Sequence, residues 1–475
     1  MALQWIEDEF STLDLGDLRR NRRAVSIVEQ LSRIAESTPD ACLDNTSLVA
    51  TYRFANNPAV SRDAILDAHN QAAIVRSAQL QTVVLAQDTT IFDLTKPKRQ
   101  VKGAGPLESD DKFGFFFHPL YAISEEGIPI GIVDQVIWAR ESIRTGLTKP
   151  EKERLRKQMC YEEKESSRWL DMLQSGEQIA RANPQTHYVS IGDSESDIHE
   201  LFLEIDTQSP NHDFIMRGCQ SRALVAGECD PANVDEALER CEIQFQSAAN
   251  VSERTSMIAD EKRVRRKSRA ARVAKIGIRA TSVNVRGPAR PGGKLRDVRL
   301  NVVEAVELDP PAGEEPIRWV LYTSLPINEI AQIQRVIALY GLRWNIELFF
   351  KTLKSGMGIE KMKYETLDRY LTMSSMMMVV AWRVEQIKLA ARLDADSSCE
   401  KYFESSEWQP VYLVTKKTRI LPQSPPTMGE FVILLAQLGG YLNKKGQGPP
   451  GSKTIWRGLR RLAAYREAYE AFGIA

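Results

Sequence analysis

Three acidic residues, widely separated in the sequence, could together act on phosphate esters. Asp88 follows the apolar segment TVVLAQ, Asp193 follows YVSIG, and Glu347 lies within RWNIELFF. Strand ends are where ligands and catalytic groups gather in an open α/β sheet, and both aspartates follow expected strands. Three converging carboxylates repel one another unless cations neutralise them. The pattern predicts Asp88, Asp193 and Glu347 as catalytic residues and as metal ligands.

The expected metals are divalent cations that prefer oxygen donors. Carboxylate ligation favours Mg²⁺ or Mn²⁺, which keep open positions for water and phosphate oxygens. Two such ions about 3.5–4 Å apart can hold the attacking and leaving oxygens of a displacement at phosphorus. We therefore expect two Mg²⁺ or Mn²⁺ ions per active site. This chemistry needs no histidine base, and the chain has only five histidines. Alternatively, each aspartate only caps a turn, a role that QDTT and GDSE suit.

The segment YGLRWNIELFFKTLKSG (340–356) combines one acid with three basic residues and two large rings. If the segment is one helix, at about 100° per residue these side chains share a single stripe. The stripe consists of Tyr340, Arg343, Trp344, Glu347, Lys351 and Lys354. The opposite face is apolar and is expected to pack on a core; it consists of Leu342, Ile346, Phe349 and Leu353. The stripe predicts contacts between basic side chains and DNA phosphates. The alternative is a solvated surface with ion pairs at one-turn spacing.

Composition restricts the class of protein. The chain of 475 residues is 43% hydrophobic and 27% charged, which is typical of a soluble globular protein with two to four domains. Its 63 basic and 63 acidic residues balance, so nucleic-acid binding must depend on local patches. Six cysteines without a CxxC pair argue against a zinc site and favour a reducing compartment. Neither a signal peptide nor a membrane-spanning segment is expected, so we expect a cytoplasmic protein.

The first 70 residues are predicted to form a helical DNA-binding domain. Asp17 is a suitable N-cap for an amphipathic helix that continues to about residue 36. A second helix, TSLVATYRFAN, and a third that starts after Ser61 follow it. Arginines near one end of these helices suggest contacts with DNA, namely Arg19, Arg20, Arg22, Arg23 and Arg53. The alternative is a helical cap with a solvated basic face.

The remaining chain is predicted to form two further domains. Residues 71–369 alternate between strands and helices and predict a mixed α/β sheet, with a β-rich insertion at about 220–325. Within this insertion, KRVRRKSRAARVAK (262–275) is interpreted as a basic loop. Residues 370–475 are predicted to be helical. We expect the Met-rich helix Tyr370–Leu393 to be core and any dimer interface to lie after Thr427. The capping box TMGE marks a helix start there.

The spacing Tyr340-x2-Arg343-x3-Glu347-x6-Lys354 resembles the YREK signature of bacterial insertion-sequence transposases of the DDE type, and within these the group of transposon Tn-five. QDTT and GDSESDIH are similar to the segments that carry the first and second acids of this family. GDLRRNRR and TYRFANNP resemble its N-terminal DNA-binding region, and LGGYLNKKG its C-terminal region. The resemblance covers nearly the whole chain. It implies a ribonuclease-H-like core with helical flanking domains, the C-terminal one serving dimerisation and synapsis.

The resemblance also implies an activity, cut-and-paste transposition. In this family, a water activated by the metals nicks one strand, and the freed 3′-OH attacks the opposite strand to form a hairpin. A second water opens the hairpin, and the ends are joined to target DNA. The implied partners are double-stranded DNA, as transposon inverted-repeat ends and as target, and a second copy of the chain in a synaptic complex. A bacterial, nucleoid-associated location follows from the same resemblance.

Three further site residues are implied by the resemblance alone. Trp319 matches the position that receives a flipped base during hairpin formation, and Arg217 and Trp344 match positions near the hairpin. Stacking on an aromatic ring recovers about 1–3 kcal/mol of the cost of unstacking a base. The alternative for Trp319 is a core tryptophan on a strand. Two residues depart from the family pattern: Ser194 replaces an arginine and Phe350 replaces a histidine.

Two other functions remain open at this point. A metal-dependent nuclease of the same fold would cut DNA without joining it, although such an enzyme has no need for domains that pair two ends. A catalytically inactive DNA-binding regulator of transposition would lack metal-dependent nicking. The YREK segment and the flanking domains favour the transposase over the nuclease, and the complete set of three acids favours it over the regulator.

Overall fold

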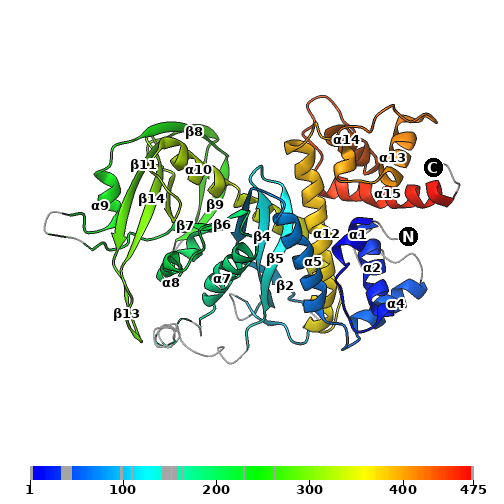
Figure 1. Ribbon diagram of the computed structural model, residues 1–475, viewed down its shortest axis with the longest axis horizontal. Coiled ribbons are helices and arrows are strands. Elements are labelled where there is room, and N and C mark those ends of the chain that lie inside the picture. The colour runs from blue at the N-terminus through cyan, green and yellow to red at the C-terminus, as the bar shows by residue number, and fades with distance from the viewer. Residues whose placement is uncertain are drawn as a thin grey trace. The chain divides into compact units, whose positions relative to one another are not determined.

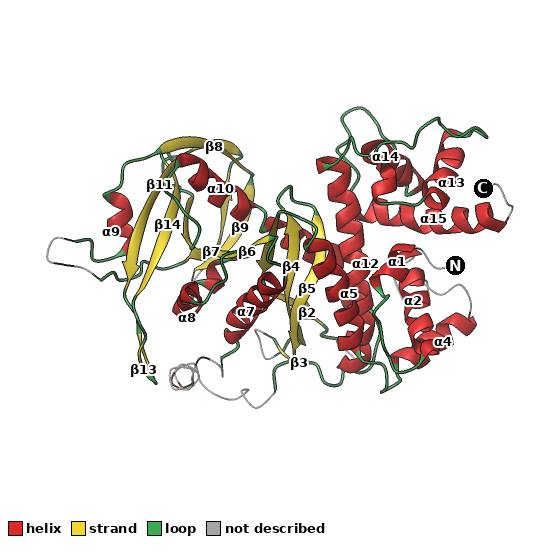
Figure 2. Ribbon diagram, viewed as in Figure 1, coloured by secondary structure: helices red, strands yellow, loops and turns green. Residues whose placement is uncertain are grey.

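The protein is described here by a computed structural model (Figure 1). The described residues are 4–33, 45–96, 100–107, 111–141, 164–225, 230–260 and 263–471, with isolated positions at 151, 154, 159, 161 and 227. The chain forms two compact units. Unit 1 comprises residues 1–148 and 344–475, and unit 2 comprises residues 149–343. Both units contain helices and strands (Figure 2).

The N-terminal part of unit 1 is helical, as predicted. Its helices are α1 (Gln4–Glu9), α2 (Leu18–Arg33), α4 (Asn45–Ala55) and α5 (Arg62–Ser77). The Asp17 carboxylate accepts a hydrogen bond of 2.8 Å from the Arg19 backbone N–H and so caps α2. Ser61 caps α5 in the same way, through a bond of 3.1 Å from the Ala64 N–H. Both predicted helix starts are confirmed.

The sheet of unit 1 is built around one long strand. Its strands are β1 (Thr82–Gln87), β2 (Thr90–Asp93), β3 (Gly105–Pro106), β4 (Phe113–Ser124) and β5 (Pro129–Trp138). The other four strands all pair antiparallel with β4. β1 and β2 pair with β4 in one continuous register, with Gln87 opposite Leu120 and Thr90 opposite Phe117. Asp88, which lies between these strands, therefore borders the middle of β4.

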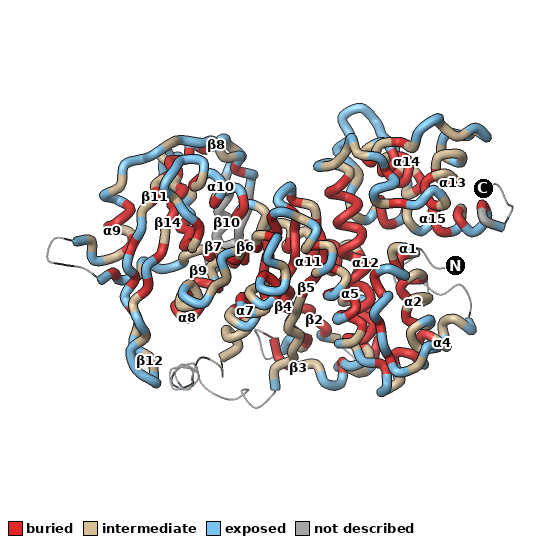
Figure 3. Tube along the Cα trace, viewed as in Figure 1, coloured by how far each residue is buried: buried red, intermediate tan, exposed pale blue. Residues whose placement is uncertain are grey.

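The C-terminal part of unit 1 consists of helices. They are α11 (Trp344–Lys351), a π-helical turn (Thr352–Gly356, hereafter the π-turn), α12 (Leu367–Leu393), α13 (Ser405–Lys416), α14 (Met428–Leu438) and α15 (Ser452–Ala471), with short 3₁₀ turns at Ile359–Lys361 and Cys399–Lys401. α12 is buried along nearly its whole length, which confirms the Met-rich segment as core (Figure 3). The capping box of Thr427 and Glu430 at the start of α14 is also confirmed.

Unit 2 combines parallel and antiparallel strands. Its main sheet has the order β6-β7-β15-β14-β11-β8, in which only β6 and β7 are parallel. Its elements in chain order are α7 (Ser167–Ala182), β6 (His187–Gly192), a 3₁₀ turn (Ser194–Ser196), α8 (His199–Phe202), a 3₁₀ turn (Leu203–Asp206), β7 (His212–Gly218), α9 (Val234–Glu239), β8 (Phe245–Val251), β9 (Arg254–Asp260), β10 (Arg263–Arg269), β11 (Arg272–Val285), β12 (Ala289–Arg290), β13 (Gly293–Lys294), β14 (Val298–Glu307), β15 (Arg318–Thr323) and α10 (Ile330–Gly341).

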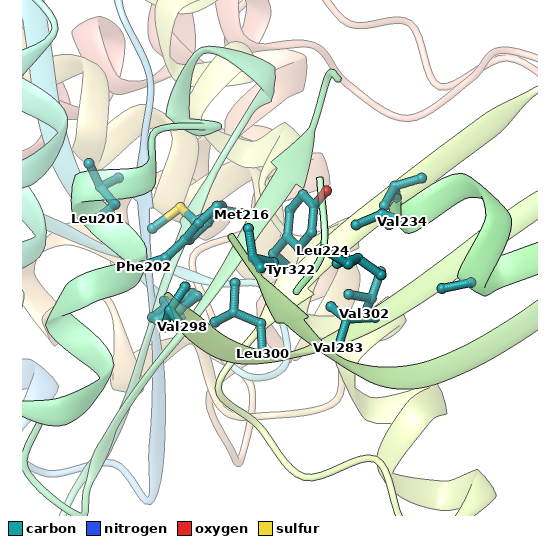
Figure 4. Close-up of a cluster of buried hydrophobic side chains, with 14 of the residues drawn as sticks. Leu201, Phe202, Met216, Leu224, Val234, Val283, Val298, Leu300, Val302 and Tyr322 are labelled. Carbon is teal, nitrogen blue, oxygen red and sulfur yellow. The ribbon is translucent and has the colours of Figure 1, made fainter. Parts of the chain in front are cut away.

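A hydrophobic cluster joins the two halves of unit 2. Phe202 from α8, Met216 from β7, Val302 from β14 and Tyr322 from β15 lie together in its interior (Figure 4). The α/β strands before residue 220 and the β-rich segment after it therefore share one core. The predicted mixed α/β character is confirmed, and the strands β8 to β15 lie within residues 245–323.

Lys262 lies outside the described residues, and most of the rest of the basic stretch 262–275 is not a loop, so this part of the prediction is wrong. Residues Arg263–Arg269 form β10, which pairs antiparallel with β9, and Arg272 begins β11. Strand pairing satisfies the backbone N–H and C=O groups regardless of side-chain charge. A run of basic residues can therefore continue a hairpin as easily as a loop.

The segment 340–356 is not one continuous helix, which corrects a second prediction. α10 ends at Gly341, α11 begins at Trp344, and the π-turn follows from Thr352. The N–H groups of Leu342 and Arg343 bond carbonyls three residues back, at 3.1 Å each, which is the tightening expected at a helix end. Glycine costs about 1 kcal/mol relative to alanine within a helix, and Gly341 lies at this break. The predicted single stripe is thus divided between three helical segments.

None of the helices in the described part of the chain is long and apolar enough to cross a lipid bilayer.

Candidate active site and nucleic-acid interface

Unit 2 brings together an acid, two arginines and two aromatic rings that the sequence singled out. β6 and β7 pair in parallel from Tyr188 opposite His212 to Gly192 opposite Met216, so the next position along places Asp193 beside Arg217. Arg217 is opposite Leu321 on β15. Because side chains alternate along a strand, Trp319 projects from the same face as Leu321 and Arg217. Asp193, Arg217 and Trp319 thus lie on one face of the sheet.

Tyr340 at the end of α10 completes this group. Its ring meets that of Trp319 edge to face, with centroids 6.3 Å apart. Burial raises the pKa of the Tyr340 hydroxyl, the charges of Arg343 and Arg217 lower it, and the charge of Asp193 raises it. All three charged groups therefore act on the same hydroxyl. That hydroxyl is buried and makes no well-aligned hydrogen bond with any described residue.

The exposure of Trp319 argues against the interpretation of this residue as a core tryptophan. Its side chain is 40% exposed, whereas the next four residues of β15 are buried. Core packing therefore does not account for Trp319. A half-exposed ring that rests on Tyr340 offers a surface on which a base could stack.

Asp193 also caps the turn that follows it. Its carboxylate accepts a hydrogen bond of 2.8 Å from the Glu195 N–H. The Asp88 carboxylate likewise accepts a bond of 2.7 Å from the Thr89 N–H. The capping alternative is thus observed for Asp193, whereas the Asp88 bond reaches only the adjacent residue and caps no helix or turn. It does not exclude a second role, because each carboxylate has two oxygens with about four acceptor positions.

In unit 1, α11 lies over the part of β4 that Asp88 borders. Phe349 of α11 stacks on Tyr121 at 4.8 Å, and Phe350 meets Phe117 at 6.3 Å. Tyr121 is opposite Ala86 on β1, so Asp88, two residues on, points toward the face of the sheet that carries these rings. Glu347 lies on the same helix, two residues before Phe349, so its side chain points about 200° around the helix from that ring. Unit 1 therefore places Asp88 and the helix that carries Glu347 on one side of its sheet.

The other residues of the predicted stripe differ in exposure. Trp344 is 57% exposed and Lys351 is exposed, while Lys354 is half-buried within the π-turn. The Lys354 ammonium lies 5.6 Å from the centre of the Phe92 ring. Burial lowers the pKa of Lys354, and the nearby charge of Glu360 raises it. As predicted, Ile346, Phe349 and Leu353 are fully buried, whereas Leu342, the fourth residue of the predicted apolar face, is only half-buried.

A metal ion at this site would be held by carboxylate oxygens. Asp88, Asp193 and Glu347 are an oxygen-only donor set, and such a set fits Mg²⁺ or Mn²⁺. In the described part of the chain, no three His, Cys, Asp or Glu side chains are grouped closely enough to hold a metal ion. Asp88 and Glu347 belong to unit 1 and Asp193 to unit 2. The assembly of the three acids remains a prediction.

The N-terminal arginines do not form a uniform patch. Arg19 is paired with Asp17 at 3.0 Å, and Arg20 donates a hydrogen bond of 2.7 Å to the Leu15 carbonyl. Arg22 and Arg53 are exposed, and Arg23 is half-buried. Arg22 and Arg53 are therefore exposed without the Asp17 ion pair that Arg19 makes, although the Arg19 side chain is itself 89% exposed.

One residue near the site was not predicted from the sequence. Asp197 is buried and accepts hydrogen bonds from the Cys219 N–H at 2.8 Å and from the Arg222 side chain. It thereby holds the loop that follows Arg217 and Gly218. Its position in GDSESD, four residues after Asp193, is the only signal that could have identified it.

Comparison with known families assigns three segments of the chain. Residues 2–60 match the family model "Transposase DNA-binding", residues 228–382 match "Transposase DDE domain", and residues 379–472 match "Transposase Tn5 dimerisation domain". The DDE match includes Glu347 but neither aspartate. Among solved structures, a piggyBac transposase synaptic complex with hairpin DNA is similar at 10% sequence identity and a TM-score of 0.35. The match covers 99% of this chain and 78% of that one.

The mixed sheet and its helices, together with the DDE match, fit the ribonuclease-H-like α/β core of a DNA transposase. Members of this class generally use divalent metals. The chain belongs to the DDE transposases related to the Tn5 transposase.

Proposed function

We propose that the chain is a cut-and-paste transposase whose catalytic residues are Asp88, Asp193 and Glu347. The observation that carries this proposal is the group formed in unit 2 by Asp193, Arg217, Trp319 and Tyr340. A carboxylate, a guanidinium and a half-exposed indole on one face suit a DNA end at which one phosphate reacts and one base leaves the stack. The YREK spacing at 340–354 supports the same interpretation.

Each basic residue has a proposed role that follows from its position. Arg343 and Arg217, whose charges act on Tyr340, bind phosphates close to the scissile bond. Lys351 and Lys354 bind the flanking phosphates from the α11 side. Tyr340, which is buried, supports the ring of Trp319, on which the flipped base stacks. Trp344, which is 57% exposed, lies against the same end of the DNA.

The three carboxylates would hold two Mg²⁺ or Mn²⁺ ions. When bound, these ions supply a nucleophile at neutral pH and neutralise charge that develops at phosphorus. The chain's own residues position the DNA: arginines fix the phosphates, and Trp319 stabilises the extruded base. Nicking, hairpin formation, hairpin opening and strand transfer are all displacements at phosphorus, so one site can perform each of them.

The proposed assembly is a homodimer that pairs two transposon ends. Residues 1–70 bind the inverted repeats, residues 71–369 form the catalytic domain, and residues 370–475 serve dimerisation and synapsis. The matches to DNA-binding and dimerisation families at 2–60 and 379–472 support the two outer assignments. A cytoplasmic, nucleoid-associated location in a bacterium is part of the same proposal.

The test uses linear DNA that carries the inverted repeats flanking the gene. With Mg²⁺, we expect flush excision through hairpin intermediates, followed by strand transfer into a target plasmid. Cleavage without hairpins or joining would indicate a nuclease instead. Binding without Mg²⁺-dependent nicking would indicate a regulator.

A further inference from the structure

A buried glutamate joins the π-turn to two other helices of unit 1. Glu385 lies in α12 and is 1% exposed. One of its carboxylate oxygens accepts hydrogen bonds from the hydroxyls of Thr352 and of Ser452, the latter at 2.7 Å. Its other oxygen forms an ion pair with Lys388. Thr352 begins the π-turn and Ser452 begins α15, so three segments meet at one carboxylate.

Burying the Glu385 carboxylate carries a free-energy cost, so its presence in the core needs an explanation. A buried carboxylate is tolerated only when its oxygens are paired, and apolar side chains of similar volume stabilise a core at least as well. Apart from its hydrogen-bonding partners, Glu385 has neighbours that would suit an apolar core. Tyr121, whose pKa is raised by burial and then by the charge of Glu385, stacks on Phe349 of α11.

The charged groups around Glu385 come from several elements. Lys388 donates a hydrogen bond of 3.1 Å to the Ser452 hydroxyl as well as pairing with Glu385. Burial lowers the pKa of Lys388, Glu385 raises it, and the charges of Arg392 and Lys351 lower it. The network therefore joins α12, the π-turn and α15, and the charge of Lys351 acts on Lys388.

The π-turn determines where Lys354 lies. The Met357 N–H donates to the Thr352 carbonyl at 2.8 Å, which is the five-residue bond of a π-helix. The extra residue in this turn rotates the side chains after Lys351 relative to a regular helix, and Lys354 comes to rest over Phe92. π-Helices are rare, occur mostly as single turns within α-helices, and are frequent at functional sites. Here the hydroxyl of the first residue of the turn is fixed by Glu385.

We propose that Glu385 is a positioning residue for Lys354 and makes the geometry of the π-turn depend on the docking of α15. This inference rests on the proposed phosphate-binding role of Lys354. α15 lies within the segment that matches the dimerisation family. The same contact therefore couples the docking of α15 to the π-turn that follows α11, the helix that carries Glu347.

The first measurement is amide hydrogen exchange on the full-length protein without DNA or metal. Thr352→Val removes the hydroxyl at nearly constant shape, and Thr352→Ser retains it. Thr372→Val is the matched control, because the Thr372 hydroxyl is also buried but bonds only the Asp368 carbonyl of its own helix. We expect Thr352→Val to accelerate exchange at residues 352–357 about tenfold, with the rest of α12 unchanged. Ser452→Ala should accelerate exchange at both residues 352–357 and the start of α15.

The second measurement is single-turnover nicking of paired ends. Thr352→Val should slow nicking about tenfold while end binding changes much less, and Thr352→Ser should restore the rate. If exchange at 352–357 is the same in Thr352→Val and Thr372→Val, the positioning role is refuted. If Ser452→Ala alters only α15, the coupling is refuted. Absence of nicking in the unaltered protein would instead refute the proposed function, since the exchange result does not depend on it.

Discussion

Trp319 on β15 meets Tyr340 at the end of α10 edge to face, with ring centroids 6.3 Å apart. The tyrosine is buried, while the tryptophan is 40% exposed. Edge-to-face pairs contribute about 0.5–1.5 kcal/mol beyond the area that they bury, so Tyr340 fixes the orientation of the indole. The Trp319 indole is thus held in place by Tyr340, while part of its surface remains open to a ligand.

This relationship predicts a selective effect of Trp319→Ala. The first nick requires no flipped base, so its rate should change less than about threefold. Hairpin formation should slow by about 10–100-fold, which corresponds to the loss of about 1–3 kcal/mol of stacking. Denaturing gels of time courses separate the two products. Trp319→Phe, which keeps a stacking ring, is the control and should retain most hairpin formation; equal loss of both steps in Trp319→Ala would exclude the base-stacking role.

A second prediction separates catalysis from DNA binding. Glu347→Gln should reduce nicking at least about 1,000-fold, because a neutral amide lacks the negative charge with which a carboxylate binds divalent cations. Binding of the ends should stay within about threefold, since binding depends on phosphate contacts by basic residues. Gel-shift and nicking assays measure the two effects. Asp88→Asn should behave in the same way, and chelation of divalent ions by EDTA should stop nicking by the unaltered protein.

Parallel loss of binding and nicking in Glu347→Gln would contradict this separation. Glu360→Gln provides a matched control on the same unit, because Glu360 accepts a hydrogen bond of 3.0 Å from the Asp93 N–H and is not proposed to bind metal. Its nicking rate should fall far less than that of Glu347→Gln.

The sequence predicted those elements whose patterns arise locally. α2, α5 and α14 carry capping residues at their starts, and β1, β4 and β6 are mostly apolar and almost fully buried. Local patterns are sufficient in such cases because a helix satisfies its own backbone hydrogen bonds between its caps, and a buried strand shows as a short, mostly apolar segment. The grouping of Asp193, Arg217, Trp319 and Tyr340 was accessible only through the family resemblance, since these residues come from four separate segments.

The departures from prediction have nonlocal causes. The pattern of 340–356 suits a single helix, and the break after Gly341 is visible only as a weak glycine signal. The π-turn at Thr352 depends on Glu385, which is 33 residues away along the chain. The β10 strand depends on its pairing with β9, which overrides the charge of KRVRRKSR. Tertiary partners, unlike caps and apolar periodicity, leave no local signal.

A third prediction concerns the pH dependence of nicking. Burial lowers the pKa of Lys354 below its ordinary value of 10.5, so this ammonium loses its proton at a lower pH than an exposed lysine does. A phosphate contact that needs the charged form should therefore weaken as the pH rises through the lowered pKa. We expect the nicking rate to decline on the alkaline side, and Lys354→Met to abolish that decline along with most of the rate. The measurement is a pH–rate profile under single-turnover conditions.

Lys351→Met serves as the comparison, because Lys351 is exposed and lies one turn earlier. It should lower the rate without removing the alkaline decline. A decline that persists unchanged in Lys354→Met would assign it to another group.

A fourth prediction concerns the N-terminal arginines. Arg22 and Arg53 are exposed, whereas Arg19 is already paired with Asp17. Arg22→Ala and Arg53→Ala should each weaken end binding and reduce the slope of log Kd against log salt by about 1, as expected for the loss of one phosphate contact. Arg19→Ala, the matched control, should have a smaller effect. Salt titrations of end binding measure the slopes, and equal slopes in all variants would place the DNA interface elsewhere.

The last prediction concerns the buried network that anchors α1 within unit 1. The Glu9 carboxylate is 2% exposed and bonds His69 Nδ1 at 2.5 Å and the Arg76 guanidinium at 2.7 Å. Burial raises the pKa of Glu9, but His69 and then Arg76 outweigh it, and the pKa is lowered below the ordinary 4.5. The Arg76 side chain also stacks on Trp382 of α12, at 4.4 Å from the ring centre.

Glu9→Gln should therefore destabilise the protein by about 3 kcal/mol at pH 7, near the low end expected for breaking a buried ion pair, since the Arg76 side chain is 31% exposed. Because the folded pKa is lowered, the stabilising effect of the carboxylate is fully present above pH 4.5 and is lost as the pH falls through the folded value. The difference between the two proteins should accordingly shrink below pH 4.5. Urea unfolding at a series of pH values measures it. Glu7→Gln, an exposed change in the same helix, should stay within about 0.5 kcal/mol of the unaltered protein, and a pH-independent difference for Glu9→Gln would show that packing rather than charge anchors α1.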